Sequence, residues 1–158
     1  MQLTQKERYL LEDQKSHEEL CIKKYSNYTN QAQDPQLKQL FTELGNQEQQ
    51  HLNTVNQILN GQVPNVNQGQ QNQQQQQGMQ TQANQSMGQS GMNNQNDADL
   101  CNDVLTTEKY VSSTYNTAIF EFRDTNIRQA LNHIQKEEQE HGEKIFNYMQ
   151  SHGMYNVQ

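Results

Sequence analysis

Apolar residues recur at gaps of three and four in four separate stretches of the chain. This spacing keeps side chains on one face of an α-helix, whereas a β-strand would show strict alternation. The pattern predicts helices at about 4–31, 35–60, 98–123 and 125–152. The apolar or small positions that form the four stripes are Leu11, Cys21, Tyr25, Tyr28, Leu37, Phe41, Leu44, Val55, Ile58, Cys101, Val104, Val111, Tyr115, Ala118, Phe122, Ile127, Leu131, Ile134, Ile145 and Tyr148.

The ends of these helices carry sequence signals. Asp34 precedes Pro35, which places a good N-cap before a proline at the first helical position. Asp124 is in the same position before the last helix, and Gly153 is a plausible stop after it. The sequence therefore predicts two helical hairpins, each with a short turn.

The chain repeats itself with a constant offset of 90 residues. Such an offset, held over some forty positions without a gap, indicates two copies of one structural unit. The aligned pairs are Asp13 with Asp103, Glu18 with Glu108, Tyr25 with Tyr115, Asp34 with Asp124, Leu37 with Ile127, Gln39 with Gln129, Leu44 with Ile134, Glu48 with Glu138, His51 with His141 and Val55 with Ile145.

Two hairpins joined by one long connection give an all-α four-helix bundle with a ferritin-like topology. We expect a first hairpin at 1–60, a crossover linker at 61–97 and a second hairpin at 98–158, with both hairpins forming one domain. The linker is rich in Gln, Asn, Gly and Met. It buries too little apolar surface to offset its ordering entropy, so we predict that it is disordered.

Composition argues against several classes of partner. The formal net charge is -7 and the basic residues are interspersed with acidic ones, which does not suit a nucleic-acid binder. No apolar run approaches the roughly 20 residues of a membrane span, and the start lacks the apolar core of a signal peptide. Cys21 and Cys101 form no metal or redox motif and are expected to be buried thiols.

Six ionisable residues occupy positions in the stripes where Leu or Val would be expected. Burying a carboxylate costs several kcal/mol unless it is protonated, paired or bound to metal. Glu and His three residues apart lie on one helical face and can reach the same ion. Two such pairs with two single glutamates form the ligand set of di-iron and di-manganese carboxylate proteins, in which zinc can substitute. The predicted ligands are Glu18, Glu48, His51, Glu108, Glu138 and His141.

Two other interpretations of these residues stay open from the sequence. They could form a proton-sharing network that fixes helix register, or helix rotation could leave them partly exposed. Among other polar residues, Asp13 and Asp103 are candidates to accept hydrogen bonds from the ligating histidines, with a surface role as the alternative. The residues interpreted as surface groups are His17, His133, Glu43, Glu137, Glu140 and Glu143.

The second half of the chain resembles the coat F domain of bacterial spore coat proteins. The residues that carry the resemblance are 105–115, 128–131, 137–141 and 153–155, and the first half resembles a more diverged copy, as in clostridial members with two units. The resemblance implies a ferritin-like fold, synthesis in the mother-cell cytoplasm and deposition in the spore coat. It implies no established enzymatic activity. The expected partners are other spore coat proteins, or further copies of this chain in a homodimer or higher oligomer.

Two functional hypotheses follow. In the first, the chain is structural coat material whose bundle is stabilised by a di-metal carboxylate site, with the Gln-rich segment as an interaction or cross-linking arm. In the second, the same centre makes the protein a di-iron or di-manganese oxidase, peroxidase or catalase-like enzyme that protects the spore. The structural role is the preferred hypothesis.

Overall fold

The structure is a computed structural model that describes residues 2–64 and 95–155. Within these ranges the chain forms four α-helices and no β-strand, which confirms the predicted all-α class. None of these helices has the length and apolar character needed to cross a membrane. The central part of the predicted Gln-rich arm, residues 65–94, lies outside the described ranges. The helices are α1 (Gln5–Gln31), α2 (Pro35–Leu59), α4 (Gln95–Glu121) and α5 (Thr125–Ser151).

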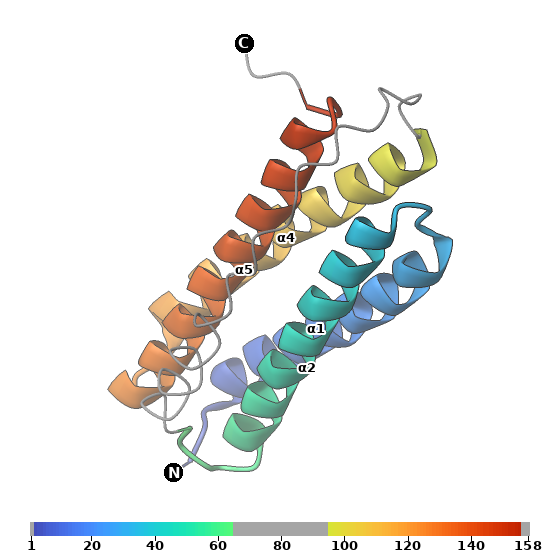
Figure 1. Cartoon of the computed structure of the whole chain (residues 1–158). Helices are drawn as coiled ribbons and strands as arrows, with labels where there is room; N and C mark the ends of the chain where they lie inside the picture. The colour runs from blue at the N-terminus through green and yellow to red at the C-terminus, as the bar shows by residue number, and fades with distance from the viewer. Residues whose placement is uncertain (1, 65–94, 156–158) are drawn as a thin grey trace, which may run out of the picture.

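The helices pack as two hairpins side by side, which confirms the predicted four-helix bundle. Helix α1 pairs with α2 and α4 pairs with α5, while α1 also lies beside α4 and α2 beside α5 (Figure 1). Helix α2 ends at the opposite end of the bundle from the point where α4 begins. Helices α2 and α4, which follow one another along the chain, therefore run in the same direction. This is the arrangement of a bundle with one crossover connection.

The predicted helix ends are largely confirmed. Asp34 caps α2 through the backbone N–H of Gln36, with proline in the first turn, and Asp124 caps α5. Helix α1 begins at a capping box in which Thr4 and Glu7 bond to each other's backbone N–H. Gly153 follows α5 with φ 68°, a left-handed conformation that favours glycine.

Helix α4 begins earlier than the sequence pattern predicts. The pattern places residues 95–97 in the disordered linker, but they form the first turn of α4, so that part of the prediction is wrong. The reason is a tertiary contact of Asp97, which is 1% exposed. Its two carboxylate oxygens accept the backbone N–H groups of Gln33 and Asp34, each at 2.9 Å, in the turn between α1 and α2.

The opposite end of the bundle has a matching contact. Glu7, in the first turn of α1, accepts the backbone N–H of Arg123 at 3.1 Å in the turn between α4 and α5. Glu7 and Asp97 are separated by the repeat offset, as are Gln33 and Arg123. A carboxylate of each hairpin therefore accepts backbone N–H groups in the turn of the other hairpin. We call this pair of contacts the reciprocal capping.

The core consists of two apolar clusters with a polar layer between them. One cluster includes Val55 of α2 and Ile134 of α5, and the other includes Leu44 and Ile145 of the same helices. The predicted stripe positions are buried, except Tyr28, which is only partly buried. Cys21 and Cys101 are buried free thiols, as predicted.

Candidate metal centre

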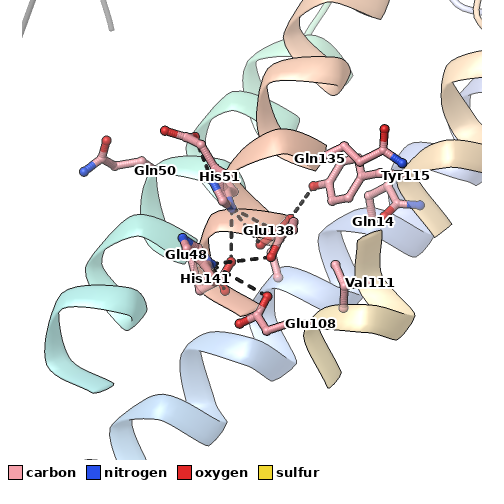
Figure 2. Close-up of polar contacts among 12 residues, drawn as sticks. Gln14, Glu48, Gln50, His51, Glu108, Val111, Tyr115, Gln135, Glu138 and His141 are labelled. Carbon is pink, nitrogen blue, oxygen red and sulfur yellow. Dashed lines mark hydrogen bonds and ion pairs between the residues drawn. The ribbon is translucent and has the colours of Figure 1, made fainter. Parts of the chain in front are cut away.

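The polar layer contains all six residues that the sequence predicts as ligands. Each of them is at most 2% exposed. Figure 2 shows side chains from α2 and α5 pointing toward one another, with Glu108 approaching from α4. The convergence and burial of the set are therefore as predicted, and partial exposure through helix rotation is excluded. The residues come from α1 (Glu18), α2 (Glu48, His51), α4 (Glu108) and α5 (Glu138, His141).

The six side chains form two overlapping groups of four. Within each group, one nitrogen or oxygen atom from every residue lies within 4.8 Å of the others. Glu48 and Glu138 belong to both groups, so these two carboxylates have the placement expected of bridging ligands. The first ligand group is Glu18, Glu48, His51 and Glu138, and the second ligand group is Glu48, Glu108, Glu138 and His141.

Both imidazoles face the carboxylates through Nδ1. His51 Nδ1 lies 3.1 Å from Glu48, 3.2 Å from Glu138 and 3.7 Å from Glu18. His141 Nδ1 lies 3.2 Å from the other oxygen of Glu48, 3.5 Å from the other oxygen of Glu138 and 3.7 Å from Glu108. The two halves of the layer therefore match closely, as the repeat requires.

A tyrosine supports each unshared glutamate from the opposite hairpin. The Tyr115 hydroxyl donates to Glu18, and the Tyr25 hydroxyl donates to Glu108. Both tyrosines are fully buried, so the predicted core packing is confirmed. Each hydroxyl bonds to one oxygen, Oε1, and leaves Oε2 of the same carboxylate facing the layer.

Burial and mutual contact set the protonation of the layer. Burial, with neighbouring carboxylates, raises the pKa of Glu18 to about 8 and that of Glu108 well above its ordinary value. Burial alone would also raise the pKa of Glu48, but hydrogen bonds from the two histidines lower it. Burial alone would lower the histidine pKa values, but the surrounding carboxylates raise both of them. Histidine hydrogen bonds lower the pKa of Glu138 as well, so without a cation these directions favour charged Glu48 and Glu138 beside two imidazolium groups, with protons on Glu18 and Glu108.

This protonated arrangement leaves buried polar atoms without partners. Oε2 of Glu18 and of Glu108 make no hydrogen bond among the described residues, although a protonated carboxyl there would need an acceptor. Both oxygens of Glu138 also lack a hydrogen bond within the described ranges, despite their proximity to the imidazoles. Buried carboxylate oxygens without hydrogen bonds, gathered beside imidazole nitrogens, suit hard or borderline divalent cations. The residues present therefore fit a metal pair better than a proton-sharing network.

The outer nitrogen of His51 has a partner that sequence reasoning missed. Its Nε2 lies 2.9 Å from Glu137, a residue that the sequence pattern places among the surface charges. Glu137 is instead mostly buried and also lies 3.5 Å from His133. Asp13 and Asp103 do not contact the histidines: Asp13 is exposed, and Asp103 binds Lys24 and Tyr28. The supporting carboxylate thus comes from α5, across the bundle.

The remaining predicted surface residues lie outside the layer. Glu43 pairs with Lys144, Glu140 pairs with Lys136, and Glu143 is exposed. His17 is partly buried and contacts the edge of the Tyr110 ring. Among these predicted surface residues, only Glu137 contacts the candidate centre, and His133 lies beside Glu137.

A cavity of about 510 Å³ lies between α4 and α5 and extends to the layer. Its inner wall includes Glu108 and Glu138, and Gly142, Leu105 and Phe146 form much of the rest. Other lining residues, such as Lys109, are exposed, so the cavity opens at the surface. The second ligand group therefore lies beside this cavity, although Oε2 of Glu108 and both oxygens of Glu138 are themselves buried.

Comparison with known proteins found similarity in the second hairpin. Residues 96–158 match the sequence model of the Coat F domain. The chain is also 38% identical over 63 residues to the uncharacterized protein YusN of Bacillus subtilis, a match that covers 40% of this chain and 57% of that protein. No solved structure matches the chain. The match coincides with α4 and α5, which supply Glu108, Glu138 and His141, so it is the second hairpin of this chain that is similar to the Coat F domain.

Proposed function

We propose that the chain is a component of the bacterial endospore coat whose bundle holds two divalent cations in the polar layer. The Coat F domain match supports the coat assignment. The buried carboxylate oxygens without hydrogen-bond partners among the described residues carry the metal assignment. Iron and manganese suit a set of four carboxylates and two imidazoles, and zinc could take their place.

In this role the cations stabilise the bundle. Four carboxylates and two imidazoles are removed from water in the folded state. The attraction between the carboxylates and the positively charged groups beside them must offset that desolvation. A cation that binds the folded chain and not the unfolded chain adds its binding free energy to the free energy of folding. The expected product is a durable building block, made in the mother-cell cytoplasm and assembled with other spore coat proteins or with further copies of itself.

Metal content is the direct test. Protein purified without chelator and passed through gel filtration should retain up to two Fe, Mn or Zn ions per chain by elemental analysis. His51→Ala should lower this number, whereas His17→Ala, which removes a histidine outside the layer, should leave it unchanged. Wild-type protein that binds none of these metals after metal-free refolding and reconstitution would refute the proposal.

The cavity between α4 and α5 favours a second candidate, a di-metal oxidase, peroxidase or catalase-like enzyme. A purely structural centre needs no route from solvent, but this cavity reaches two of the glutamates. A bound metal pair would supply redox chemistry toward peroxide or dioxygen. The chain's own contribution would be to position the ions, support them through Tyr25 and Tyr115, and limit access of water.

Peroxide consumption separates the two candidates. Reconstitution with Fe(II) or Mn(II), followed by an assay of residual peroxide and by an oxygen electrode for dioxygen release or uptake, should show turnover above that of the free metal if the enzyme hypothesis holds. Glu138→Ala should abolish that turnover, and Glu140→Ala, on the exposed side of the same helix, should preserve it. Bound metal without turnover leaves the structural role as the function.

A further inference from the structure

The two halves of the candidate centre differ in how the histidine is supported. His51 Nε2 lies 2.9 Å from the carboxylate of Glu137, whereas His141 Nε2 is buried with no hydrogen-bond partner among the described residues. The repeat offset places Gln47 where Glu137 stands in the other copy. The side-chain oxygen of Gln47 is likewise buried without a partner in the part of the chain that the structure describes. His51 Nε2 and the Glu137 carboxylate are therefore paired, whereas their counterparts, His141 Nε2 and the side-chain oxygen of Gln47, are not paired among the described residues.

The supporting carboxylate acts on the ligand nitrogen through the ring. A carboxylate bonded to Nε2–H fixes the imidazole tautomer, holds the ring orientation and raises the basicity of Nδ1. Loss of such a partner typically costs about 10- to 100-fold in metal affinity. An amide, being uncharged, supplies much less of this effect even where it can accept a hydrogen bond.

The second difference is access. The cavity between α4 and α5 is lined by Glu108 and Glu138, which belong to the second ligand group, and includes neither Glu18 nor His51. Gly142 helps to keep it open, and a β-carbon there would meet only Leu105, at 3.7 Å. At the corresponding position of the first hairpin the chain has Leu52. The half without a supporting carboxylate is thus also the half whose unshared glutamate, Glu108, lines the cavity.

We propose that the two ions are inequivalent: the ion of Glu18 and His51 is retained, and the ion of Glu108 and His141 is weakly held and reached by small ligands through the cavity. This inference rests on the proposed function, since it concerns ions that the centre would hold. It divides the centre into an anchoring ion and an exchangeable one. The exchangeable ion takes a small donor ligand that enters by the cavity lined by Gly142 and Glu138.

Stepwise metal titration tests the affinity difference. Metal-free protein titrated with Co(II), followed by visible absorption and chelator competition, should bind a first equivalent about 10- to 100-fold more tightly than a second. Glu18→Gln should remove the tight step and Glu108→Gln the weak one, which assigns each step to a half. Equal affinities in the wild-type protein, or the opposite assignment, would overturn the inference while leaving two-ion binding intact. Failure of Co(II), Mn(II) and Fe(II) all to bind would instead refute the proposed function.

A swap of the supporting residues tests the cause. Gln47→Glu should tighten the weak step toward the strong one, and Glu137→Gln should weaken the strong step by about 10- to 100-fold. The double variant should reverse the order in which the halves fill. Circular dichroism of each metal-free variant checks that the bundle is folded. If folded Gln47→Glu and Glu137→Gln variants both keep the wild-type constants, the supporting carboxylate is not the cause.

Azide, a small anionic ligand, tests access. It should perturb the Co(II) spectrum only after the second equivalent is added. Gly142→Leu, which introduces the residue found at position 52, should suppress this perturbation, while Gly142→Ala should retain it because the β-carbon fits. An azide response at one equivalent, or one that Gly142→Leu leaves unchanged, contradicts access through the cavity.

Discussion

The shared position of Glu48 gives the sharpest test of the two-ion arrangement. One of its oxygens lies 3.1 Å from His51 and the other 3.2 Å from His141, so it belongs to both ligand groups. Glu18 belongs to the first group alone. Glu48→Gln should therefore disable both ions, whereas Glu18→Gln should disable one. Glutamine keeps the shape of the side chain and removes its charge, so packing changes little.

The magnitude follows from linkage between binding and folding. When the cation concentration is well above the dissociation constant, each bound ion adds about 1.4 kcal/mol to the free energy of unfolding per tenfold rise in free cation. Once both ions are bound, the wild-type chain should show about 2.8 kcal/mol per tenfold rise. Glu18→Gln should show about half of that slope, and Glu48→Gln a slope near zero. In this concentration range the slope counts bound ions and is independent of the value of either dissociation constant.

Urea unfolding at a series of buffered Mn(II) concentrations measures this slope. Glu43→Gln is the matched control, because Glu43 is an exposed residue of the same helix that pairs with Lys144. It should keep the wild-type slope, with at most about 1 kcal/mol lost at every concentration. A wild-type slope in Glu48→Gln, or complete loss of the slope in Glu18→Gln, would show that the carboxylates are not shared as the geometry indicates.

Three further predictions concern other parts of the bundle. Burial alone would raise the pKa of Glu7, but hydrogen bonds from Thr4 and Arg123 lower it from 4.5 to about 2. The contribution of the Glu7 carboxylate to the free energy of unfolding is therefore complete above pH 4.5 and is lost as the pH falls toward 2. Glu7→Gln should cost about 2 kcal/mol at pH 7 in metal-free protein. Urea titrations should show this difference shrinking between pH 4.5 and pH 2. The exposed variant Glu12→Gln, on the same helix, should leave the urea midpoint at pH 7 unchanged. Tyr115→Phe removes the hydroxyl that donates to buried Glu18 and should destabilise metal-free protein by about 1–3 kcal/mol. Tyr110→Phe, at an exposed tyrosine, should not destabilise it. Equal urea midpoints for the two variants would contradict the hydrogen-bond argument. Replacing 65–93 by a Gly/Ser segment of equal length should preserve the melting temperature but reduce incorporation into the spore coat, and unchanged incorporation would argue against an interaction arm.

Residues 65–93 should be replaced and not deleted, because the connection between α2 and α4 must be long enough to join two opposite ends of the bundle. Helices of 25 to 27 residues are about 40 Å long, and α2 ends at the opposite end of the bundle from the start of α4. Simple deletion of 65–93 would leave 60–64 and 94 to join them, and six residues reach only about 20 Å. A deletion would therefore test chain reach and not the role of the Gln-rich composition.

The sequence was sufficient to predict the helices and the six converging residues. Apolar spacing defines one buried face for each helix, and a Glu or His on that face has no alternative to the core. The repeat then removed most of the remaining ambiguity, because the same polar residue occupied the same place twice.

The supporting contacts could not be predicted because they cross between helices at positions that the repeat does not conserve. Glu137 lies one residue before Glu138, off the apolar stripe, and its counterpart Gln47 gave no matching signal. Its role depends on the distance and rotation between α2 and α5, which spacing along one helix does not determine. Asp97 was missed for a related reason, since it follows a stretch of Gln and Asn and is ordered by the turn between α1 and α2.

The reciprocal capping makes the molecule, in architectural terms, a dimer encoded on one chain. An isolated hairpin would expose its stripe, leave its turn uncapped and supply three of the six polar groups, so it would need a second copy. Fusion replaces that concentration-dependent association with an intramolecular one. It also lifts a constraint, because a symmetric homodimer must have identical halves. On a single chain each copy can diverge alone, and the exchange of glutamate for glutamine between Glu137 and Gln47 is a difference that a symmetric homodimer could not have.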